Sequence, residues 1–78
     1  MEIIKQYELG KITLSQLELE RDSLEIQAMN YSTKIYTSKT VEEEKYYRKK
    51  YEDEARKYFT LVRYIEALAT PELSTVPH

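Results

Sequence analysis

The chain has no cysteine and one histidine, His78, which is its last residue. Without thiols no disulfide or thiolate metal site can form, and a zinc site with one histidine would depend on carboxylates, which is unusual. The cysteine nucleophile and the internal histidine base of nucleophilic catalysis are also missing. A single glycine, Gly10, cannot build a glycine-rich phosphate loop. We therefore predict no catalytic, metal-binding or cofactor-binding residues, and a protein that is not an enzyme.

A strong excess of one charge and a long apolar run are missing as well. The formal net charge is −2, unlike the strongly basic balance of a general nucleic-acid binder. No apolar stretch approaches the ~20 residues needed to span a bilayer, and the first residues do not resemble a signal peptide. We expect no membrane association and, by default, a cytoplasmic location.

The small size of the chain limits its core. Seventy-eight residues make one domain at most, which we place over residues 1–70. Domains this small usually need disulfides, metals or oligomerisation to supplement the core. Because the first two are missing, we expect self-association or a protein partner.

What the chain does contain is residues that favour helix. Between Lys11 and Thr70 there is no glycine or proline, while Pro71 and Pro77 both lie near the end. Thr70-Pro71 should end the last helix, since the residue before proline avoids helical geometry. We predict three helices followed by a disordered tail, over residues 2–9, 14–37, 41–69 and 71–78.

Two helix starts have recognisable capping sequences. Thr13 and Gln16 have the spacing of a capping box, flanked by Ile12 and Leu17 at the positions of a hydrophobic staple. The segment from Thr40 to Glu43 predicts a second capping box. Gly10 is placed to end the first helix in a left-handed conformation.

The phase of the apolar residues distinguishes a hairpin from one continuous helix. Apolar residues recur at 3–4 spacing from Leu14 to Ile35, and the same register extended past Ser38 lands on polar residues. The apolar residues of the last helix, from Tyr47 to Ala69, lie on nearly the opposite side. A turn near residues 37–39 brings both sides together. We predict an all-α fold in which a short N-terminal helix precedes an antiparallel helical hairpin.

Basic and aromatic residues alternate along the last helix. Basic side chains fall near one line, flanked by tyrosines, although acids interrupt it and i,i+4 pairing would make much of it a salt-bridged solvated face. The aligned residues can instead bind an acidic protein surface or, as an alternative, nucleic acid. The residues we predict to bind a partner are the exposed Tyr46, Lys49, Arg56, Arg63 and Tyr64.

A second apolar set on the middle helix lies off its main stripe. A two-helix hairpin has one contact surface, so Leu19, Ile26 and Met29 need another cover. The first helix can cover part of this set, and a second subunit can cover the rest. We predict that these three residues mediate self-association into a dimeric helical bundle.

Together these features predict a protein–protein interaction module that acts as an adaptor, inhibitor or assembly factor. Small helical chains of this composition are also common among accessory proteins of bacteria and their phages. The alternative is a small nucleic-acid-associated regulator that uses the basic and aromatic residues of the last helix.

Overall fold

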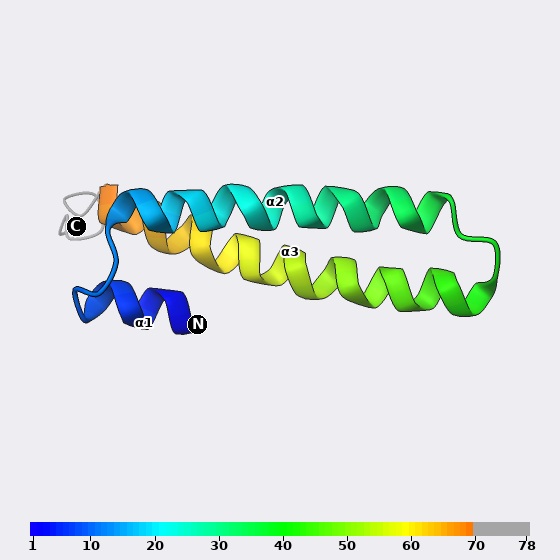
Figure 1. The fold of residues 1–78 in the computed structure, drawn as a ribbon, viewed down its shortest axis with the longest axis horizontal. Helices are drawn as coiled ribbons and strands as arrows, with labels where there is room; N and C mark the ends of the chain where they lie inside the picture. The colour runs from blue at the N-terminus through cyan, green and yellow to red at the C-terminus, as the bar shows by residue number, and fades with distance from the viewer. Residues whose placement is uncertain (70–78) are drawn as a thin grey trace, which may run out of the picture.

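The computed structural model describes residues 1–69, so the tail predicted over residues 71–78 lies outside the described residues. Three helices make up the fold: α1 spans Glu2–Glu8, α2 spans Leu14–Tyr36 and α3 spans Val41–Ala69. The helices α2 and α3 form an antiparallel hairpin, and α1 lies beside the end of the hairpin that is far from its turn (Figure 1). The described residues are thus all-helical, as predicted. None of the three helices is both long and apolar enough to span a membrane.

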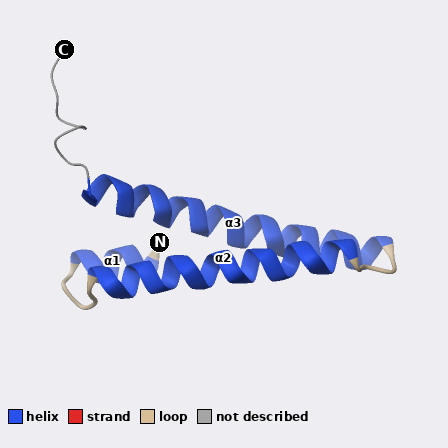
Figure 2. Ribbon diagram, turned by 90° about the horizontal axis from the view of Figure 1, so that it is seen from above, coloured by secondary structure: helices blue, strands red, loops and turns tan. Residues whose placement is uncertain are grey.

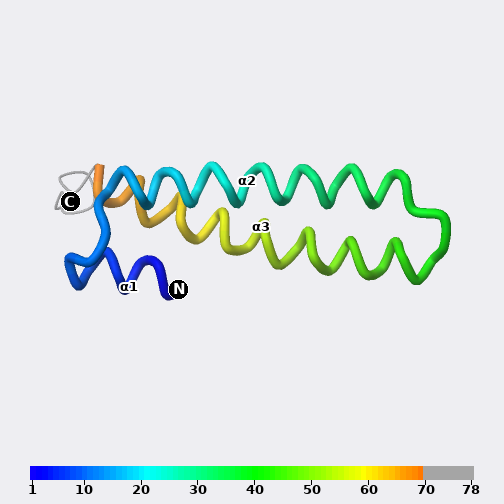
Figure 3. Tube along the Cα trace, viewed as in Figure 1, coloured from blue at the N-terminus to red at the C-terminus, as the bar shows by residue number. Residues whose placement is uncertain are grey.

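The chain doubles back between α2 and α3, so the alternative of one continuous helix is wrong. The two helices run side by side over most of their length in both views (Figures 1 and 2). Helix α1 is antiparallel to α2 and much shorter, and it reaches only part of the way along the hairpin (Figure 3). The molecule therefore has three helices at one end and two at the turn.

The aliphatic core lies at the three-helix end. It consists of Leu17 and Leu24 from α2 with Leu61 and Ile65 from α3, all buried. Further residues pack against this cluster from α1, from the α1–α2 connection and from α3: Ile3, Ile4, Tyr7, Ile12, Tyr58 and Tyr64.

Towards the turn, tyrosines replace the aliphatic residues between α2 and α3. The rings of Tyr31 and Tyr47 have their centroids 6.3 Å apart. Buried tyrosine hydroxyls need polar partners, so this half of the hairpin is a wetter contact than the aliphatic core.

Local chemistry sets the ends of α1 and the start of α2. Gly10 has φ +77°, and the amides of Gly10 and Lys11 donate to the carbonyls of Tyr7 and Gln6, which makes a Schellman motif. The capping box at Thr13 is present, because Gln16 N–H donates to Thr13 Oγ1 and Thr13 N–H donates to Gln16 Oε1.

The hairpin turn is built by side chains, without glycine or proline. At the end of α2, the hydroxyls of Thr37 and Ser38 donate to the carbonyls of Thr33 and Lys34, at 3.2 and 2.7 Å.

The reciprocal capping box predicted at Thr40 is only half present. Glu43 N–H donates to Thr40 Oγ1, but the Glu43 carboxylate accepts from the amide of Lys39 instead of that of Thr40. The carboxylate thus bonds one residue further back, inside the turn, which explains how a segment without strong helix breakers reverses direction.

One carboxylate lies within the contact between α2 and α3. The side chains of α3 that face α2 recur at 3–4 spacing, and Glu54 takes the position between Tyr51 and Tyr58. Its side chain is only 15% exposed; Lys57 Nζ lies 3.6 Å from Oε1, while Oε2 is buried without a hydrogen-bond partner. Glu54 is therefore not part of the exposed acidic side of α3.

Candidate protein-interaction surface

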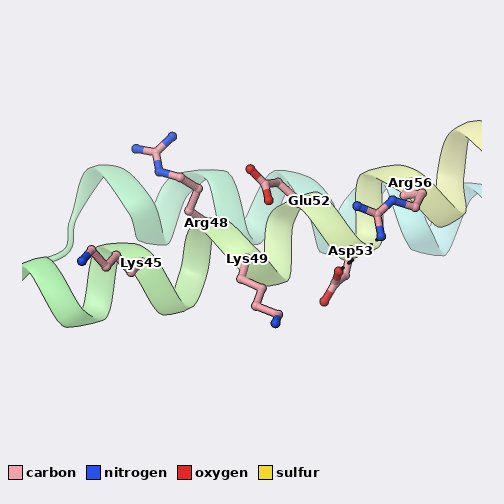
Figure 4. Close-up of a pocket in the computed structure, with 6 residues that line it drawn as sticks. All are labelled: Lys45, Arg48, Lys49, Glu52, Asp53 and Arg56. Atoms are coloured by element: carbon pink, nitrogen blue, oxygen red, sulfur yellow. Dashed lines mark ion pairs between the residues drawn. The ribbon is translucent and has the colours of Figure 1, made fainter.

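The turn half of α3, which Met1 and Glu2 approach only at Arg56 and Lys57, presents a concentration of basic side chains. Two adjoining hollows on this helix are lined by basic residues, by one tyrosine and by a few acids. Six of these residues together are named the basic surface: Lys45, Tyr46, Arg48, Lys49, Lys50 and Arg56. Figure 4 shows four of these side chains, Lys45, Arg48, Lys49 and Arg56, on successive turns of α3, and Lys49 points away from α2.

Only part of this charge is paired. Arg48 lies 3.4 Å from the Glu44 carboxylate, and Arg56 lies 3.9 Å from that of Asp53, the pair marked in Figure 4. Within residues 1–69, neither Lys45 nor Lys49 has a carboxylate within 4.0 Å. The predicted salt-bridged face is therefore incomplete, and two ammonium groups remain available on one side of the helix.

Tyr46 lies beside these lysines and is held by its neighbours. Its side of the helix is open, with 57% of the residue exposed. The ring packs edge-to-face on Tyr47 at 5.2 Å, and Lys50 Nζ lies 5.5 Å from its centroid. An exposed aromatic ring that is already oriented loses little side-chain entropy on binding and is typical of interface hot spots.

The five predicted partner-binding residues do not form one surface. Tyr46, Lys49 and Arg56 contribute to the basic surface. Arg63 is exposed but lies seven residues beyond Arg56, about 10 Å further along the helix axis. Lys45, Arg48 and Lys50 were not among the predicted binding residues, although the run from Lys45 to Lys50 indicated them.

Tyr64 is half-buried between α3 and α1, so its predicted exposure is wrong. Its ring packs edge-to-face on Tyr7 at 6.2 Å, and its hydroxyl donates to Glu8 Oε2 at 3.1 Å. Burial raises the pKa of Tyr64, and the hydrogen bond to Glu8 adds to this effect. Tyr64 thus attaches α1 to the hairpin.

A similar hydrogen bond joins the two long helices. The hydroxyl of Tyr58 donates to Glu25 Oε2 at 3.2 Å. Burial raises the pKa of Tyr58, followed by the negative charge of Glu25 and its hydrogen bond.

The predicted self-association residues are all exposed: Leu19 by 68%, Ile26 by 58% and Met29 by 63%. Helix α1 therefore does not bury them, contrary to expectation. Two of them, Leu19 and Ile26, point away from α3 by the helical repeat. Met29 instead faces the edge of the hairpin, where it lines a hollow with Phe59, which was not among the predicted site residues. The sequence does contain an indication for Phe59, because this single phenylalanine lies outside the apolar stripe of its helix.

Residues 1–69 contain no cluster of three or more histidine, cysteine or acidic side chains placed to hold a metal ion. Comparisons with protein-family models, curated proteins and solved structures find no match for this chain.

Proposed function

We propose that this protein is a non-enzymatic interaction module whose basic surface binds an acidic surface of another protein. The observation that carries the proposal is the pair of unpaired ammonium groups, Lys45 and Lys49, beside the exposed ring of Tyr46 on one rigid helix. Attraction to carboxylates would orient the partner, and burial of the aromatic ring would supply contact energy. Binding of this kind suits an adaptor, inhibitor or assembly factor.

The mixed charge of the surface favours a protein partner over nucleic acid. Glu42, Glu52 and Asp53 line the same hollows as the lysines. A phosphate backbone carries only negative charge, so each carboxylate would oppose it. A protein surface can place bases opposite these acids and acids opposite the lysines.

We also propose that the chain pairs with a second copy of itself. Only four residues are buried in the described structure, while twelve large apolar or aromatic residues are exposed. A small core with this much exposed apolar surface is stabilised when a second subunit covers part of it.

Quantitative affinity capture from nuclease-treated host lysate tests the partner proposal. The tagged full chain should recover a protein whose yield falls at least about fivefold with Lys49→Glu, because charge reversal at the surface removes an attraction and adds a repulsion. Lys11→Glu makes the same charge change at an exposed residue at the other end of the hairpin, and it should leave the yield unchanged.

The contribution of the Tyr46 ring to partner binding is tested by a variant and a matched control. Tyr46→Ala should reduce the same capture, whereas Tyr36→Ala, at a residue 88% exposed on α2, should not. A capture that survives both Lys49→Glu and Tyr46→Ala would contradict the proposed surface. A salt-sensitive shift of DNA or RNA that Lys49→Glu abolishes would favour the nucleic-acid alternative.

A further inference from the structure

The side of the hairpin away from α1 has an apolar hollow at its middle. Ala28 and Ala55 lie in this hollow of about 210 Å³, and its other lining residues are Glu25, Met29, Ser32, Tyr51, Tyr58 and Phe59. Met29 and Phe59 are 63% and 57% exposed, so two large apolar side chains beside this space are open to contact. We call this side, from α2 and α3 together, the open face.

The two ends of the hairpin carry opposite charge. The three-helix end, residues 1–25 and 58–69, has seven acids and four bases. The turn half, residues 26–57, has six acids and eight bases. A second copy lying antiparallel on the first would therefore meet opposite charge at both ends.

The same polarity appears along the open face. By the helical repeat, Glu18, Asp22 and Glu25 lie on its α2 edge, on the same side as Met29. At the turn end, Arg48 lines a hollow with Ile35 and Tyr36 that shares residues with the central one.

We infer that the open face is a self-association surface that pairs with the open face of a second copy, antiparallel, about a two-fold axis near Ala28 and Ala55. Each Phe59 would then enter the alanine-lined hollow of the other copy, which makes the contact self-complementary, as a two-fold interface requires. This inference rests on the proposed self-association and assigns it to one face.

The two-fold axis sets the register of the two copies. Because the axis would run across both long helices near Ala28 and Ala55, each helix of one copy would lie against the same helix of the other. The three-helix end of one copy would then lie over the turn half of the other.

The open face is a better candidate than the outer side of α2. Leu19 and Ile26 are exposed on one helix only and point away from α3. Residues of the open face come from both long helices and surround a hollow, so two copies would form a four-helix contact with interlocking side chains.

Sedimentation equilibrium of the full chain over a range of concentrations tests this assignment. The wild type should form a dimer, and Phe59→Ser should raise the dimer dissociation constant roughly tenfold or more, because each dimer loses two central anchors. Ile26→Ser, an apolar residue of equal exposure on the outer side of α2, is the matched control and should leave it unchanged. Circular dichroism of each variant should show unchanged helix content.

Ionic strength tests the antiparallel arrangement. Added salt should raise the dimer dissociation constant of the wild type, because it screens the attraction between the oppositely charged ends of the two copies. A chain that stays monomeric at every concentration would overturn both the self-association and the open face. A dimer weakened by Ile26→Ser but not by Phe59→Ser would overturn the open face alone.

Discussion

At the scale of single residues, Glu54 is the least favourable feature of the hairpin. Its Oε2 is buried without a partner, and an unsatisfied buried polar atom is destabilising. Glu54→Leu should raise the free energy of unfolding by about 1 kcal/mol, because an apolar side chain of similar size removes the desolvation cost. Urea unfolding followed by circular dichroism measures the change. Glu52→Leu, at an exposed residue two positions earlier, should shift it by less than about 0.5 kcal/mol, and an equal gain from both would show that only helix propensity had changed.

A substitution in the aliphatic core should lower the free energy of unfolding instead of raising it. Leu61 is fully buried among Leu17, Leu24 and Ile65. Leu61→Ala should lower the free energy of unfolding by roughly 2–5 kcal/mol, since it removes apolar contacts and leaves a cavity. A domain of this size is stabilised by only ~4–12 kcal/mol, so thermal unfolding should show a large drop in Tm. Leu19→Ala removes the same atoms from a residue 68% exposed and should change stability little.

The two tyrosine–carboxylate hydrogen bonds predict a loss of stability at alkaline pH. Burial, followed by the Glu25 or Glu8 carboxylate, raises the pKa of Tyr58 and Tyr64 above their usual 10.0. The unfolded chain therefore loses these protons first, so their contribution is complete below about pH 10 and is lost as the pH rises through the raised folded values. Urea midpoints should fall above about pH 10, and they should fall less steeply in the Tyr58→Phe/Tyr64→Phe double variant. Parallel curves for both proteins would contradict this assignment.

At the scale of helices, the Schellman motif sets the direction in which the chain leaves α1. Gly10 has φ +77°, a region that costs a residue with a side chain about 1 kcal/mol or more, although a Cβ there would meet no atom within 4 Å. Gly10→Ala should therefore destabilise the protein by about 1 kcal/mol through the backbone alone. Unfolding measurements should show a similar loss for Thr13→Ala, which removes the adjacent N-cap. A neutral Gly10→Ala would mean that α1 does not depend on this motif.

The starts and ends of the helices could be predicted because they depend on a few neighbouring residues. The capping box at Thr13, the left-handed Gly10 and the change of apolar phase near Ser38 all act within a few residues. α1 and α2 end at Glu8 and Tyr36, each one residue before the predicted end.

The errors in the candidate site come from contacts between helices that are distant in sequence. Tyr64 is half-buried only because α1 packs beside it, and no local pattern gives the position of α1. Glu54 and Ala55 are neighbours, and a small shift in phase decides which of them faces α2. Phe59 was missed because the hollow beside it needs Ala28 and Ala55 from two helices.

At the scale of the whole molecule, the core, the basic surface and the open face lie in different parts of the hairpin. At the end far from the turn, α1 lies beside the hairpin (Figure 1), and this end contains the aliphatic core. The turn half carries the exposed basic surface. The open face lies along the middle, at an edge of the hairpin. In the proposed dimer, the antiparallel arrangement would therefore place two basic surfaces at opposite ends, so one dimer could hold two partners.

These roles all depend on the chain doubling back, which a distance measurement checks directly. The absence of native cysteine allows specific labelling of the pair Ser15→Cys and Ala67→Cys. In the hairpin both lie at the same end, on neighbouring helices whose axes pack ~8–10 Å apart, so spin labels should be within about 25 Å. In one unbroken helix the same residues would be about 78 Å apart. An excess of unlabelled protein ensures that few dimers contain two labelled copies, so the measured distances are those within one chain. The pair Ser15→Cys and Thr33→Cys lies within α2 alone and should give about 27 Å with either arrangement, which calibrates the labels. A long Ser15–Ala67 distance would separate Arg48 from Ile35, remove the hollow beside Phe59, and leave neither the open face nor its pairing with a second copy.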